Sequence, residues 1–265
     1  MPPNDTLQLA YWKELEQVMK ATNSYEQLEA VVQRYLPGLP AMNTDHVLNF
    51  RLNWDINDKY AQHWLPILDP FLNPFTVHTT GDGGCFSNAA SRMTYGHEQY
   101  ANQLRMRMVI EGVLHAPDYV NHNKLQIGFE TFVPTESLPT LDAVYTMLSA
   151  AEQNKMPVED RNVPLKVFQR TLFEYRKPRT EAGLWAFNLL ANVTKRPILS
   201  MYHDIQGGVG QKPGEHFAQQ WDCMNRIIYP FDQRYKDEAY GAIAWSGTDN
   251  TLPHMNPNHF VSVVP

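Results

Sequence analysis

The sequence predicts an α+β fold, with one small central β-sheet flanked by helices and an N-terminal helical extension. Most of the chain carries the 3.6-residue apolar periodicity of amphipathic helices. The short apolar runs that indicate strands come from distant segments, which one small sheet has to bring together. We expect residues 1–40 to form the extension and residues 41–265 the domain that holds the sheet.

Helices are expected over residues 7–20 and 24–36, where Ser24 and Gln27 supply a capping box for the second. Residues 41–76 are irregular, apart from a short helix near 58–65. The glycine-rich stretch at 81–85 opens a further helix, which the Tyr95-Gly96 pair ends. Later helices are predicted over residues 98–114, 139–153, 164–175 and 181–194. On the first of these, Arg105 and Arg107 are expected on a solvated face.

The strands are expected in segments that are separated by long stretches of chain. An extended segment at residues 77–80 leads into the glycine-rich stretch, and the Lys195-Arg196-Pro197 break precedes a buried strand at 198–202. Three more strands are predicted near residues 226–229, 242–245 and 260–264.

The stretch Gly81–Ser91, GDGGCFSNAAS, is the most informative part of the chain. It predicts a strained glycine turn that delivers Cys85 to the first turn of a helix. Free backbone N–H groups and the helix dipole favour a thiolate at that position. The N–H groups of Asp82, Gly83, Gly84 and Cys85 are also placed to hold the oxyanion of a tetrahedral intermediate.

Composition excludes several other classes of function. The net charge is −6 and no Lys/Arg-rich run is present, which argues against nucleic acid as a partner. The N-terminal residues lack the pattern of a secretory signal, and no long apolar run indicates a membrane span. The two cysteines form neither a disulfide framework nor a metal-binding CxxC pair. We therefore expect a cytoplasmic or nuclear protein without cofactors.

The residues from Gly81 to Ser91 closely resemble the nucleophile signature of the ovarian-tumour (OTU) cysteine proteases, with Gly84 in place of the usual Asn. The unit around Lys195–Ile198 resembles the central helix and strand of the same family. The resemblance implies a papain-type cysteine protease fold and makes residues 41–265 a catalytic domain. It also implies that Cys85 is the nucleophile.

A cysteine nucleophile needs a neighbouring base, which is usually histidine. His259 follows a Pro-Asn loop and opens an apolar strand, as the catalytic histidine does in OTU enzymes. It is therefore the expected base. No metal site is expected, because the chain lacks an HExxH motif and His254 is separated from His259 by Pro257.

The third member of the catalytic triad is less clear from the sequence. Most OTU enzymes orient the histidine with an Asp or Asn two residues later, where this chain has Val261. The ending resembles the His-Phe branch of zinc-finger OTU enzymes, which implies an acid supplied from upstream. Asp55 is the first choice and Asp58 the alternative, with Asn256 and Asn258 as local amide candidates. Asp82 is expected to brace the turn rather than to transfer protons.

The resemblance implies a deubiquitinase, which hydrolyses peptide or isopeptide bonds after the C-terminal glycine of ubiquitin or a ubiquitin-like protein. Ubiquitin and polyubiquitin are then the expected partners. Acidic residues are expected along the path of the basic ubiquitin tail, and Glu130, Glu136 and Asp142 are the candidates. The alternative is a catalytically inactive OTU fold that binds ubiquitin or another protein within a larger regulatory or mobile-element protein.

Overall fold

The structure is a computed structural model that describes residues 3–42, 57–58, 61–62, 75–121, 163–180, 182, 185–201, 226–246 and 259–264. By packing, the chain divides into two compact units. One comprises Met1–Met42 and Arg105–Thr180, and the other comprises Asn43–Leu104 and Glu181–Pro265. The domain boundary expected at residue 40 stays a prediction.

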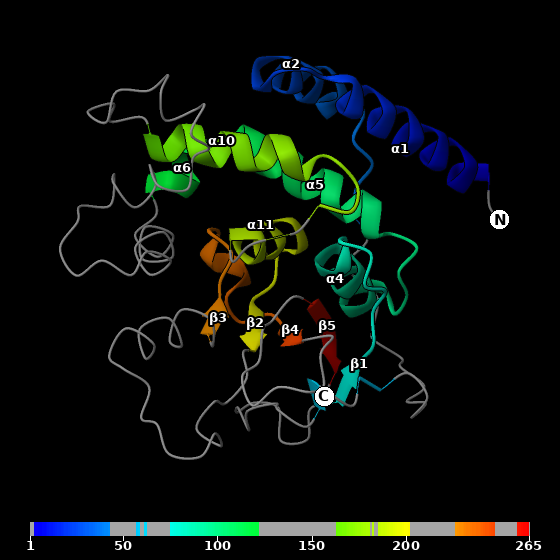
Figure 1. The fold of residues 1–265 in the computed structure, drawn as a ribbon, viewed down its shortest axis with the longest axis vertical. Coiled ribbons are helices and arrows are strands. Elements are labelled where there is room, and N and C mark those ends of the chain that lie inside the picture. The colour runs from blue at the N-terminus through cyan, green and yellow to red at the C-terminus, as the bar shows by residue number, and fades with distance from the viewer. Residues whose placement is uncertain are drawn as a thin grey trace. The chain divides into compact units, whose positions relative to one another are not determined.

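The second unit is built on a β-sheet (Figure 1). Its strands, within the described residues, are β1 (Phe75–Val77), β2 (Ile198–Met201), β3 (Arg226–Ile228), β4 (Gly241–Ser246) and β5 (His259–Val264). They lie in the order β1-β5-β4-β2-β3, and all neighbours are antiparallel except β2 and β4. The sheet is therefore mixed, and β5 lies between β1 and β4.

Two helices, α4 (Cys85–Tyr95) and α11 (Trp185–Thr194), cover one face of this sheet (Figure 1). Successive side chains of a strand point to opposite faces, so alternate residues meet the helices. An aromatic cluster fills this contact. Its rings are edge-to-face, stacked or tilted, with contacting centroids 4.4–6.0 Å apart, and belong to Phe86, Phe187, Trp245 and Phe260.

The other face of the sheet carries a second buried cluster, built from the alternate residues of β2, β4 and β5. Its members are small or aliphatic: Ala61, Leu199, Met201, Ala242, Ala244, Val261 and Val263. The strands read as nearly continuous apolar runs because the sheet is buried on both faces.

The first unit contains α1 (Pro3–Ala21), α2 (Tyr25–Tyr35), the short η1 turn (Leu36–Gly38), α6 (Ala116–Asn121), α10 (Val163–Tyr175) and most of α5 (Ala101–Leu114). The Ser24 hydroxyl caps α2 by accepting from the Gln27 N–H at 3.3 Å. None of the helices in the described part of the chain is long and apolar enough to span a membrane.

The prediction that Arg105 and Arg107 lie on a solvated face of α5 is wrong. Arg105 is buried and donates to the Lys177 carbonyl at 3.1 Å. Arg107 donates to the Pro40 carbonyl at 2.6 Å, and its guanidinium lies 4.8 Å from the ring centroid of Trp12. Both side chains act as internal donors to backbone carbonyls near chain turns.

The predicted α+β class with one small sheet is confirmed. The helices expected at the N-terminus, after the glycine-rich stretch and at 164–175 and 181–194 are present. The four later strands lie where the sequence predicts them. The first strand, β1, ends at Val77, so it shares only that residue with the extended segment predicted at 77–80. The helix expected at 139–153 lies outside the described residues.

Candidate active site

The glycine-rich turn places Cys85 at the first residue of α4, as the sequence predicts. Gly83 has a φ of 80°, which an L residue rarely adopts, so the turn needs glycine there. The Asp82 carboxylate accepts from the Gly84 N–H at 2.9 Å. Asp82 thus braces the turn, and the Gly84 N–H is engaged in this structure. That leaves it unavailable for the oxyanion role expected of it unless Asp82 moves.

Side chains of α4 and of the loop that follows it form hydrogen bonds to the same turn and to Thr80 before it. Asn88 donates to the Thr80 carbonyl at 2.9 Å and to Asp82 Oδ1 at 3.1 Å. Glu98 accepts from the Thr80 hydroxyl at 2.7 Å, from its N–H at 3.1 Å and from Arg92 Nε at 2.8 Å. Burial opposes ionisation of Glu98, but these donors lower its pKa below the ordinary value. The turn is therefore fixed at both of its ends.

The Cys85 thiol is buried, with 5% of the residue exposed. Burial raises its pKa above the ordinary value. Backbone N–H groups of Phe260, Phe86 and Cys85 itself interact with the sulfur and act in the opposite direction. The helix start favours the thiolate as expected, but desolvation is the larger effect, so the neutral thiol prevails.

His259 is the first residue of β5, and its imidazole is buried. Its Nε2 lies 3.1 Å from the Thr79 hydroxyl, and that hydroxyl also donates to the Phe260 carbonyl. A carbonyl only accepts, so the single Thr79 hydroxyl proton goes to Phe260 and Nε2 must donate to Thr79. The two contacts of the Thr79 hydroxyl thus assign the proton of the neutral ring to Nε2, which places the lone pair on Nδ1.

The ring edge that carries this base faces the nucleophile turn. A Cβ added at Gly81 would lie 3.6 Å from His259 Cε1 and 3.7 Å from Nδ1. On the other side, the N–H of Phe260, the residue after His259, interacts with the Cys85 sulfur. The nucleophile turn and the start of β5 therefore meet, with Nδ1 directed toward the turn.

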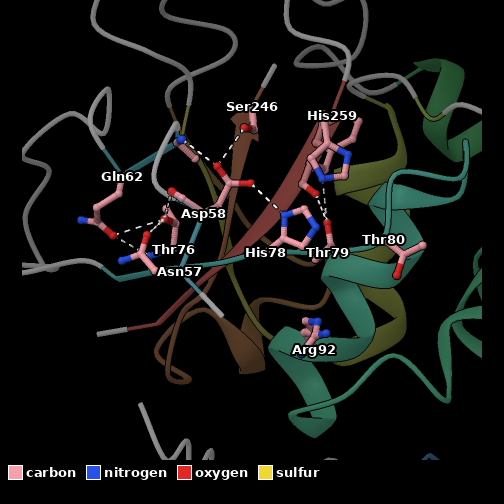
Figure 2. Close-up of polar contacts among 12 residues, drawn as sticks. Asn57, Asp58, Gln62, Thr76, His78, Thr79, Thr80, Arg92, Ser246 and His259 are labelled. Carbon is pink, nitrogen blue, oxygen red and sulfur yellow. Dashed lines mark hydrogen bonds and ion pairs between the residues drawn. The ribbon is translucent and has the colours of Figure 1, made fainter. Parts of the chain in front are cut away.

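An Asp–His pair lies beside His259 (Figure 2). The Asp58 carboxylate is 3.3 Å from His78 Nδ1 and accepts from the Ser246 hydroxyl at 3.4 Å. The ring centroids of His78 and His259 are 6.0 Å apart. Burial lowers the pKa of His259, the Asp58 charge opposes this, and His78 reinforces it. Among the described residues, Asp58, His78 and His259 offer possible metal ligands within 4.8 Å of one another.

Several predicted site residues lie outside the described residues. They are Asp55, Glu130, Glu136, Asp142, Asn256, Asn258 and the second cysteine, Cys223. Their roles stay predictions. Asp58 is described, and its carboxylate contacts His78. The side chain that hydrogen-bonds His259 Nε2 is that of Thr79.

His78 and Thr79 were not singled out in the sequence. They lie in the extended segment before the turn and match no motif. The signal that the sequence does offer is their position directly between β1 and the turn that presents Cys85, where a polar side chain lies close to that turn. That signal requires knowing that β1 pairs with β5, with Val77 opposite Ser262.

Comparison with known protein families matches residues 76–246 to a family described as "Vertnin, OTU domain". The chain belongs to the OTU domain family. OTU domains are in general cysteine proteases that bind ubiquitin. The matched region of this OTU domain includes Cys85 and ends before His259. The more specific assignment to the His-Phe branch stays a prediction. No match is found among curated proteins.

Proposed function

We propose that this OTU domain is a deubiquitinase. It hydrolyses (iso)peptide bonds after the C-terminal glycine of ubiquitin or a ubiquitin-like protein, in the cytoplasm or nucleus. The observation that carries the proposal is the assigned tautomer of His259. Thr79 fixes the proton on Nε2, and the unprotonated Nδ1 faces the turn that presents Cys85.

In the proposed reaction, Cys85 attacks the carbonyl of the terminal glycine while its thiol proton passes to His259 Nδ1. Backbone N–H groups of Asp82, Gly83 and Cys85 stabilise the oxyanion, and that of Gly84 joins them once Asp82 releases it. The imidazolium then protonates the leaving lysine amine, and a thioester remains on Cys85. Water, deprotonated by His259, hydrolyses the thioester and releases ubiquitin with a free carboxylate.

The pKa directions define the resting state of this pair. Burial raises the pKa of Cys85 and lowers that of His259, so both groups are neutral in the free protein near pH 7. Proton transfer therefore accompanies attack on the substrate. Imidazolium formation is stabilised by the nearby Asp58 charge and by Thr79, through its backbone and through the hydroxyl that accepts from Nε2.

A second candidate function is ubiquitin binding without hydrolysis, and the buried thiol with its raised pKa favours it. A thiol that stays protonated is a weak nucleophile. The two candidates differ in whether binding of ubiquitin is followed by a covalent step.

The test uses ubiquitin with a C-terminal electrophile, incubated with the full chain and followed by mass spectrometry. A ubiquitin adduct on the parent that Cys85→Ala loses and Cys223→Ala keeps supports the deubiquitinase. His259→Ala should slow labelling by about 100-fold or more. Labelling that persists in Cys85→Ala would overturn the assignment. Saturable ubiquitin binding with no adduct would establish the second candidate.

The path of the ubiquitin tail is part of the same proposal. We place the acidic side chains of Glu130, Glu136 and Asp142 along it, since the tail is basic before its final glycines. Charge reversal at the three positions should raise KM for a ubiquitin substrate and leave kcat nearly unchanged. An unchanged KM removes them from the path.

A further inference from the structure

Three potential metal ligands meet on one side of the His259 ring (Figure 2). Asp58 lies before the first strand, His78 follows the last residue of β1, and His259 opens β5. Figure 2 shows the Asp58 carboxylate directed at His78, and the Thr79-bound nitrogen of His259 turned toward the same space. The other His259 nitrogen points away from it.

Two imidazoles and one carboxylate are a donor set that suits Zn²⁺, which takes three protein ligands and leaves a position for water. Bonds of about 2.0–2.2 Å place the ligand atoms of a tetrahedral ion about 3.4 Å apart. Asp58 and His78 are already 3.3 Å apart. All three ligand atoms lie within 4.8 Å of one another, so closure requires a movement of at most about 1.4 Å.

The surroundings of the three ligands allow this closure. Asp58 Oδ1 accepts from the Ala61 N–H at 2.9 Å and from the Ser246 hydroxyl at 3.4 Å, and Oδ2 faces His78. Such outer contacts orient a ligating carboxylate. The His78 side chain is 64% exposed, whereas that of Asp58 is 9% exposed. An ion can therefore enter from solvent past His78, which is the ligand with room to move.

We propose that Asp58, His78 and His259 bind Zn²⁺, and that bound Zn²⁺ switches the thiol site off. Coordination through Nε2 requires this nitrogen to lose its proton to solvent, and it breaks the hydrogen bond to Thr79, while a proton from solvent is taken up at Nδ1. The ring proton of the neutral imidazole then resides on Nδ1, the nitrogen that has to accept the Cys85 proton. A metal-bound His259 cannot act as the base. Binding is independent of the proposed function, and only the switch depends on it.

Metal binding is tested with Co²⁺ as a spectroscopic probe on the full chain carrying Cys85→Ala, so that no thiolate at position 85 can supply the ligand. Visible absorption of bound Co²⁺ gives a Kd. Adding His78→Ala or Asp58→Asn should weaken binding by at least the 10- to 100-fold typical of losing even an outer-shell partner. Unaltered Co²⁺ affinity in both variants, or no binding by the Cys85→Ala protein, overturns the site.

The matched control is His115→Ala. His115 Nδ1 also lies 3.3 Å from an aspartate oxygen, that of Asp118, and both side chains are exposed. Among the described residues, His115 and Asp118 belong to no group of three potential metal ligands. Its loss should leave the Co²⁺ affinity unchanged. A fall equal to that of His78→Ala would mean that surface Asp–His pairs account for the binding.

The switch is tested by alkylation of Cys85 with a small electrophile, with and without Zn²⁺. Zn²⁺ should slow the parent, and His78→Ala should abolish that slowing. Equal Zn²⁺ sensitivity in His78→Ala means that the ion acts on the thiol directly and overturns the switch. Failure of the ubiquitin probe with Co²⁺ binding retained would overturn the proposed function and leave the metal site standing.

Discussion

Replacement of Thr79 by valine tests whether this hydroxyl orients the catalytic base. The substitution keeps the shape of a fully buried side chain and removes the acceptor for His259 Nε2–H. A net hydrogen bond contributes about 0.5–1.5 kcal/mol to a neutral partner and about 1.5–3 kcal/mol to a charged one. The imidazolium formed during attack thus loses about 1–1.5 kcal/mol more than the resting ring, so kcat should fall about 5- to 13-fold.

A pH profile separates orientation from general damage. The lost acceptor stabilised the protonated ring, so the pKa of His259 falls further and the acidic limb of kcat/KM moves to lower pH. The two buried groups that lose the Thr79 hydroxyl are Nε2–H and the Phe260 carbonyl, and folding should weaken by about 1–3 kcal/mol for each one that keeps no other partner. Turnover is therefore measured well below the melting temperature, by release of a fluorescent amine from the ubiquitin C-terminus.

Two further variants complete this experiment. Thr79→Ser keeps the hydroxyl and should restore most of kcat and the acidic limb. Thr180→Val removes a hydroxyl of the other compact unit, which donates to the Glu174 carbonyl at 3.3 Å, and should leave kcat within about twofold. If Thr79→Val turns over like the parent with an unshifted limb, Thr79 does not orient His259. The upstream acid then remains the better explanation.

Three other predictions follow from the same structure. Asp58→Asn should shift the acidic limb of kcat/KM to lower pH, because the Asp58 charge raises the pKa of His259. A fall in kcat on Asp55→Ala at unchanged melting temperature would instead identify Asp55 as the residue that orients His259. Gly112→Ala places a Cβ 2.6 Å from a Leu172 methyl, so thermal unfolding should show a loss of about 1–3 kcal/mol; an unchanged melting temperature would contradict this packing. Since burial lowers the pKa of His259, the unfolded chain binds the extra proton below about pH 6.5, and the parent should lose stability between pH 7.5 and 5.5 more steeply than His259→Gln; parallel curves would refute this.

The sequence was sufficient for most elements because their signals are local. Apolar periodicity and caps define α2, and the glycine turn and the Gly96 stop define α4. The order of the strands had no local signal. Pairing of β1 with β5, and the parallel pairing of β2 with β4, depend on contacts between segments far apart in the chain.

The candidate site shows the same division between local and long-range information. Cys85 and His259 were identified because each lies in a recognisable local context. Thr79 was not, since its relation to His259 exists only once β1 lies beside β5. Arg105 was misjudged for a related reason. Periodicity treats arginine as a surface residue, whereas its guanidinium reaches a carbonyl 72 residues away.

The place of β5 in the sheet has a consequence for the newly made chain. Synthesis proceeds from the N-terminus, so the other four strands emerge before β5, which lies between two of them. Until β5 inserts, β1 has no partner among the described strands and is not connected to β4. The Cys85 sulfur then lacks the Phe260 N–H, and the His259 imidazole is not yet in place. Under the proposed function, the nascent protein therefore carries its thiol without its base. Closure of the sheet by β5 then brings His259 and its contact with Thr79 to the site in one step, and the same step buries the thiol and raises its pKa.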